Sequence, residues 1–104
     1  MEKMKTDVKD ENNANRIIRQ VSKEMGIPFY ELFSKSRNHR IVFPRQLAQT
    51  ILLEKGYSEA KVADLFRQHR TTIYNAVESI EGWKVSDKKK AAEIKRIRDL
   101  MFQD

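Results

Sequence analysis

The side chains best suited to bind another molecule lie close together in the second half of the chain. They are Arg67, Gln68, His69, Arg70, Thr71, Thr72 and Asn75. Groups of these types donate and accept hydrogen bonds at base edges and at phosphates, which is the chemistry of a surface that reads nucleic acid. Such side chains gather at the N-terminus of the recognition helix in a helix-turn-helix.

Apolar residues recur at helical spacing on both sides of this polar group. They are Val62, Leu65 and Phe66 before it, and Ile73, Ala76, Val77 and Ile80 after it. Each flanking segment is therefore predicted to be an amphipathic helix that buries one stripe. Thr71 is placed to act as the N-cap of the second helix, and the free backbone N–H groups of that first turn provide a phosphate site. An ordinary helical hairpin with a solvated turn is the alternative interpretation.

The composition favours a polyanionic partner. The 104 residues carry a net charge of +6, and the pI is near 9.7. Nucleic acid is the first candidate and a membrane surface the second, because phosphates bound by Lys or Arg release condensed counterions. The absence of cysteine excludes disulfides, Cys-ligated zinc and thiol catalysis. Neither an apolar run of about 18 residues nor a secretory signal is recognisable, so we expect a cytoplasmic protein that spans no membrane.

The N-terminal part is predicted to contain one helix. Residues 1–13 are polar and are expected to form a flexible arm, so the helix is expected to begin near Asn13. The apolar stripe of this helix consists of Ile17, Ile18, Val21 and Met25. Three glycines follow apolar-periodic segments and are predicted to end helices, namely Gly26, Gly56 and Gly82.

Three further elements complete the predicted fold. Residues 29–33 form a short helical turn that contributes Phe29, Leu32 and Phe33 to the core. A basic loop at 34–40 leads into a long helix at 41–55, which tolerates Pro44 only in its first turn and buries Leu47, Ile51 and Leu52. A last helix, capped by Ser86 or Asp87, packs Ile94, Ile97 and Met101 inward. Its basic face either adds phosphate contacts or is simply solvated.

These elements predict an all-α fold. Strand-like alternation of useful length is absent from the sequence. We therefore expect a compact bundle of about five to six helices that contains a helix-turn-helix.

From Ile17 to Glu81 the order of features resembles the C-terminal DNA-binding domain of DnaA, the bacterial chromosomal replication initiator, which has a trp-repressor-like helix-turn-helix. The motifs that carry the resemblance are ELFSKSR, the PRQLA opening of the long helix, the Ser58 start of the next helix, and TTIYNAV followed by IE. On this basis residues 1–13 are assigned to a flexible arm, residues 14–83 to a DnaA-like DNA-binding domain and residues 84–104 to a basic C-terminal helix.

The resemblance implies two modes of DNA contact. The second hairpin helix is expected to enter the major groove, and Arg37, which matches an arginine of the family's basic loop, is expected to enter the adjacent minor groove and sense its width. Arg45 and Gln46 match the family's phosphate-contacting pair, and the two threonines match its paired threonines. The predicted DNA-binding residues are Lys35, Arg37, Arg40, Arg45, Gln46, Arg67, His69, Arg70, Thr71, Thr72 and Asn75.

The turn before the two threonines departs from the family pattern. The family usually carries a glycine-containing turn that ends in Asp-His, whereas this chain has Arg67-Gln68-His69-Arg70, one residue shorter. Replacing an acceptor carboxylate with cations favours guanine acceptors or phosphates over a cytosine amino group. We therefore predict that the protein need not prefer the family's usual box.

The expected function is sequence-specific binding of double-stranded DNA, without the family's ATPase module, for which the 104 residues leave no room. Replication initiation, its regulation and a mobile element are the expected contexts. The alternative is a helical interaction protein that binds nucleic acid or an acidic partner without reading a sequence.

Catalysis is not expected. His39 and His69 are far apart in the sequence, and neither an HExxH nor a Ser-His-Asp pattern is recognisable. We accordingly predict no metal, no cofactor and no small-molecule substrate. A replication protein is a candidate partner. The chain lacks a heptad zipper and the family reads its box with a single domain, so we expect a monomer or a weak dimer.

Overall fold

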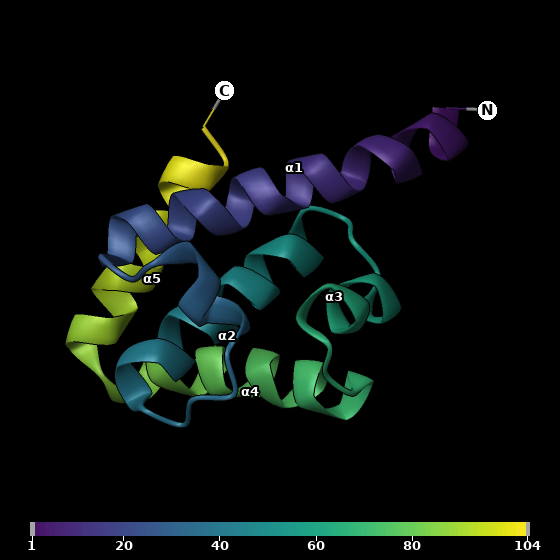
Figure 1. Cartoon of the computed structure of the whole chain (residues 1–104). Helices are drawn as coiled ribbons and strands as arrows, with labels where there is room; N and C mark the ends of the chain where they lie inside the picture. The colour runs from purple at the N-terminus through teal and green to yellow at the C-terminus, as the bar shows by residue number, and fades with distance from the viewer. Residues whose placement is uncertain (1, 104) are drawn as a thin grey trace.

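The computed structural model describes the backbone of residues 2–103 and the side chains of residues 12–103. The elements in this range are α1 (Glu2–Met25), the 3-10 helix η1 (Phe29–Phe33), α2 (His39–Glu54), α3 (Glu59–Phe66), α4 (Arg70–Ser86) and α5 (Lys88–Met101). Figure 1 shows α1 across the top of the view and α4 along the bottom. Residues 2–103 contain no strand, so the predicted all-α fold is confirmed.

The core is organised around α2, which packs against α1, α3, α4 and α5. Leu47, Ile51 and Leu52 are fully buried, as their spacing predicts. The stripes of the other helices meet them, and the completely buried side chains of these stripes include Ile18, Val21, Val62, Ile73, Ile80 and Ile97. Periodicity therefore predicted the buried faces of all five helices correctly.

The first helix is longer than the sequence analysis predicted. It begins at Glu2 rather than near Asn13. Residues 2–25 contain neither proline nor glycine, so nothing in the backbone chemistry interrupts a helix there. The flexibility of residues 1–13 stays a prediction, and the side chains of residues 1–11 lie outside the described part.

Two of the three glycines end helices as predicted. Gly26 has a φ of 70° and Gly56 a φ of 103°, and this left-handed region is readily accessible to glycine. The prediction for Gly82 was wrong, because α4 continues through it to Ser86. Trp83 packs against the core one residue later, and this contact holds the helix together beyond the glycine.

The start of α2 also differs from the prediction. Asn38 caps the helix, its side-chain oxygen accepting a hydrogen bond from the backbone N–H of Arg40 at 2.9 Å. The helix thus begins at His39, and Pro44 lies in its second turn rather than its first. Proline has no N–H to donate to the carbonyl of Arg40, so α2 lacks one of its internal hydrogen bonds there.

The last helix is fixed at both ends. Asp87 caps it by accepting a hydrogen bond from the backbone N–H of Lys90 at 3.0 Å, which confirms one of the two predicted caps. That backbone hydrogen bond, more than the nearby Lys90 charge, lowers the pKa of Asp87. Further along, Arg96 pairs with Glu24 of α1 at 2.8 Å and Arg98 with Glu54 of α2 at 3.0 Å. The basic C-terminal helix is therefore part of the packed domain.

Candidate nucleic-acid interface

The helical hairpin of α3 and α4 positions the predicted reading residues. Ser58 caps α3, its hydroxyl oxygen accepting a hydrogen bond from the N–H of Lys61 at 3.1 Å. Arg67 ends α3 in the left-handed conformation, with φ 54° and ψ 49°. Buried Val62, Phe66 and Ile73 then pack the two helices together. The Arg67 conformation reverses the chain sharply enough for α4 to start three residues later.

The structure corrects the predicted cap of α4. His69 occupies the N-cap position, and no side chain among residues 12–103 caps this helix. Thr71 is already the second helical residue, because the short turn starts the helix at Arg70. Its hydroxyl is not used for capping, which leaves it available to a ligand. The unpaired N–H groups of the first turn of α4 face the same region.

The turn between α3 and α4 and the first turns of α4 carry the predicted reading residues of the hairpin. Six of them are exposed, namely Arg67, His69, Arg70, Thr71, Thr72 and Asn75. Tyr74 is also 52% exposed on this helix and was missed by the sequence analysis. Its position outside the buried stripe of Ile73 and Ala76 was the available signal. An exposed tyrosine offers both a ring and a hydroxyl for contacts with DNA.

The basic loop between η1 and α2 lies on the same side of the molecule as α4, at the bottom of Figure 1. Lys35, Arg37 and Arg40 are exposed, as predicted for side chains that meet DNA. The Nζ of Lys35 donates a hydrogen bond to the backbone carbonyl of Arg67 at 3.3 Å. This bond joins the basic loop directly to the turn of the helix-turn-helix.

The sequence analysis predicted that Arg45 contacts a DNA phosphate, but the structure places its side chain inside the fold. Its side chain is only 7% exposed. Its Nε donates to the carbonyl of Leu32 at 3.0 Å, and its Nη2 donates to the carbonyls of Ser34 at 2.7 Å and Ser36 at 3.1 Å. Burial lowers the pKa of this guanidinium. Arg45 thus holds the loop that carries Arg37, whereas its neighbour Gln46 is half-buried.

Two further contacts fix the loop and the turn relative to each other. Gln49 of α2, which is 1% exposed, donates from its Nε2 to the Oε1 of Gln68 in the turn at 2.8 Å. The ring of Phe33 in η1 stacks on Phe66 in α3, with centroids 5.0 Å apart. Gln68 is therefore a structural residue of the turn. Sequence reasoning missed both contacts because they join residues far apart in the chain.

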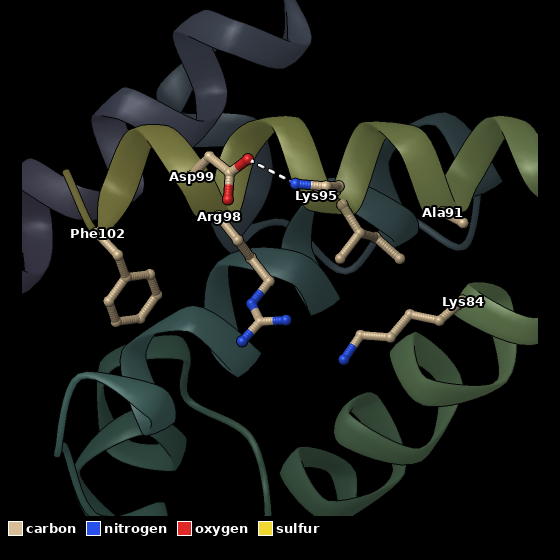
Figure 2. A pocket seen from close by; sticks show the side chains of 7 residues that line it. Lys84, Ala91, Lys95, Arg98, Asp99 and Phe102 are labelled. Atoms are coloured by element: carbon tan, nitrogen blue, oxygen red, sulfur yellow. Dashed lines mark hydrogen bonds and ion pairs between the residues drawn. The ribbon is translucent and has the colours of Figure 1, made fainter.

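The cleft between α4 and α5 is lined by cations that pair with carboxylates (Figure 2). Figure 2 shows Lys84, Lys95 and Arg98 around this cleft of about 460 Å³. Each cation already pairs with a carboxylate, Lys95 with Asp99, Lys84 with Glu81 and Arg98 with Glu54, all at 3.0 Å. In the part of the chain that the structure describes, no group of three or more His, Asp or Glu residues is arranged to hold a metal ion, and no helix is long and apolar enough to span a membrane.

Comparison with known proteins identifies the family of the helix-turn-helix. The family model described as the bacterial dnaA protein helix-turn-helix matches residues 14–80, which run from buried Ala14 of α1 to Ile80, the last buried residue of α4. No curated protein matches the chain. The family match covers more than half of the 104 residues and includes η1, α2, α3 and the hairpin turn. The chain therefore belongs to the bacterial DnaA helix-turn-helix family.

Proposed function

We propose that this protein binds a specific sequence in double-stranded DNA by reading two grooves at once. Its family is one of DNA-binding domains associated with replication initiation, and that domain is a DNA-binding unit rather than a catalytic one. In the proposed complex the first turns of α4 lie in the major groove, and Arg37 enters the adjacent minor groove. The loop and α4 lie on one side of the fold, at the bottom of Figure 1, and the side chains assigned to DNA reading in both elements are exposed.

The observation that carries this proposal is the fixed relationship between loop and turn. The loop is held to α2 by the three hydrogen bonds of Arg45 and to the turn by the hydrogen bond from Lys35 to Arg67. Two groups that read neighbouring grooves must keep a constant separation, and preorganised groups lose less entropy on binding. An unrelated solvated loop would not need these ties.

Each exposed residue has a role that suits its chemistry. Thr72 and Thr71 offer a methyl group for thymine and a hydroxyl for a base or phosphate, and Asn75 offers an amide that suits adenine. Arg70 and His69 offer donors to guanine acceptors or to phosphates. The absence of a carboxylate from this turn supports a box that differs from the family's usual one.

Arg67 and Gln46 complete the proposed surface as phosphate contacts, together with Lys35 and Arg40. We do not include Arg45, because it is only 7% exposed and its Nε and Nη2 already bind backbone carbonyls inside the fold. A protein of this kind acts on replication by occupying its boxes, either at a replication origin or in a mobile element. We propose that it does so as a monomer or weak dimer, with a replication protein as a candidate partner.

Selection from a random duplex library tests this function. The purified protein is equilibrated with the library at two salt concentrations, and the retained DNA is sequenced. Sequence reading predicts one discrete enriched motif at both salt concentrations, although total retention falls steeply as salt rises. Salt-sensitive retention without a motif would reject sequence reading in favour of general anion binding.

A further inference from the structure

A second basic surface lies where the starts of α2 and α5 come together. The two helices border a cleft of about 430 Å³, with Phe43 and Ile27 among its apolar lining residues. Its basic lining residues are His39, Arg40, Lys89 and Lys90. Half of this rim belongs to α5, which lies beyond the residues that match the family.

Two of these side chains, His39 and Lys90, are held in place by the fold. The Nζ of Lys90 lies 3.6 Å from the Asp87 carboxylate and 4.8 Å from the centre of the Trp83 ring. The same ring forms a T-shaped contact with the ring of His39, with centroids 5.4 Å apart. The α5 N-terminus is thereby fixed against the α2 N-terminus.

The other two cations are free to bind a ligand. Arg40 and Lys89 are exposed, and within residues 12–103 their side chains form no hydrogen bond or ion pair. Glu93 also lines the cleft, but its carboxylate pairs with Arg96 at 2.8 Å. The cleft therefore presents two unneutralised cations, one from α2 and one from α5.

This surface is continuous with the loop proposed to enter the minor groove. Arg37 precedes the α2 cap, Asn38, and Arg40 follows it in the first turn of α2, and Arg40 and Lys89 line the same cleft. On the other side of Arg37, Lys35 contacts the backbone of Arg67. Exposed cations thus occur at the hairpin turn, in the loop, and in the first turns of α2 and α5.

We propose that Arg40 and Lys89 bind backbone phosphates of the same duplex, immediately beyond the minor groove that Arg37 enters. The inference rests on the proposed DNA binding and adds a contact to the flanking DNA. A phosphate diester supplies the negative charge that the rim lacks, and such contacts carry no base information. The protein's footprint then extends past the base pairs that it reads, on the loop side only.

Affinity is measured for duplexes that contain the selected motif and end either at its edge or several base pairs further on the loop side. The wild-type protein is compared with Lys89→Gln and Arg40→Gln over a series of salt concentrations. Lys95→Gln is the matched control, because it removes the same charge from the same helix at a residue that pairs with Asp99. Lys95 lies at the other cleft of α5, as Figure 2 shows.

The proposal predicts that the wild type binds the longer duplex more tightly than the shorter one, whatever the sequence of the added base pairs. Lys89→Gln and Arg40→Gln should each lower affinity for the long duplex by about fivefold and reduce the salt slope by about 1, with the selected motif unchanged. Lys95→Gln should alter neither quantity by a comparable amount.

Several results would overturn the inference alone, with sequence reading intact. One is that the wild type binds the long and the short duplex with equal affinity. Another is that Lys89→Gln and Lys95→Gln lower the affinity for the long duplex equally. A third is that Lys89→Gln weakens binding of a polyglutamate peptide while leaving the salt slope for DNA unchanged, which would assign the cleft to an acidic protein. Failure of the wild type to prefer any duplex sequence would instead overturn the proposed function, and this inference with it.

Discussion

The Nζ of Lys35 lies 3.3 Å from the backbone carbonyl oxygen of Arg67 and donates a hydrogen bond to it. One residue belongs to the basic loop and the other to the turn of the helix-turn-helix, so this contact joins two regions that are 32 positions apart in the sequence. The bond uses a backbone acceptor, which leaves the guanidinium of Arg67 exposed beside it. The two regions proposed to meet DNA are therefore one surface.

Replacing Arg45 should damage the fold, whereas replacing Arg37 should damage binding. Arg45→Gln removes a guanidinium that binds the carbonyls of Leu32, Ser34 and Ser36, and it should lower the free energy of unfolding by on the order of 3 kcal/mol. Arg37→Gln changes an exposed side chain and should leave stability within about 0.5 kcal/mol. Urea unfolding measures both. Equal stability of the two variants would show that Arg45 does not hold the loop.

Arg67→Gly should stabilise the protein. A residue with a Cβ in the left-handed conformation is strained by about 1–2 kcal/mol, and glycine avoids this strain at an entropic cost of about 0.5–1 kcal/mol. We expect a net gain of up to about 1 kcal/mol in unfolding free energy. Arg67→Ala is the control, because it removes the same guanidinium without relieving the strain. A glycine variant no more stable than the alanine variant would contradict the backbone argument.

The Asp87 cap should make the stability of the protein depend on pH in the acidic range. The hydrogen bond from the Lys90 N–H lowers the pKa of Asp87 in the folded state. The ionised carboxylate therefore contributes to the free energy of unfolding above the pKa of Asp87 in the unfolded chain, and this contribution is lost as the pH falls through its pKa in the folded protein. Thermal unfolding between pH about 5 and about 2 should show a larger fall in Tm for the wild type than for Asp87→Asn. The amide retains an oxygen that can cap the helix but does not titrate in this range. Parallel Tm curves for the two proteins would exclude this role.

The sequence predicted the helices and the buried stripes well because both depend on local spacing. Leu47, Ile51 and Leu52 lie inward because their positions share one face of a helix, whatever else the chain does. The residue at which a helix starts depends also on the backbone conformation of the turn before it. Thr71 was assigned the cap of α4, but the left-handed Arg67 shifts the start of the helix so that His69 takes this position.

Arg45 shows what local patterns cannot provide. An arginine near the start of a helix was expected on the surface, but its direction is decided by the carbonyls of η1 and the loop, which the fold brings beside it. The contact between Gln49 and Gln68 has the same origin, since it joins α2 to the turn. Family membership is shown by the comparison, whereas the individual DNA contacts stay predictions.

The most direct test of two-groove reading is to repeat the duplex selection with Arg37→Ala and Thr72→Ala, after confirming that both variants keep the wild-type Tm. Thr72→Ala should weaken the base preference at positions read in the major groove. Arg37→Ala should weaken only an adjacent A·T preference, at a fixed distance from those positions. Loss of preference at the same positions in both variants, or an unchanged motif in either, would contradict the account.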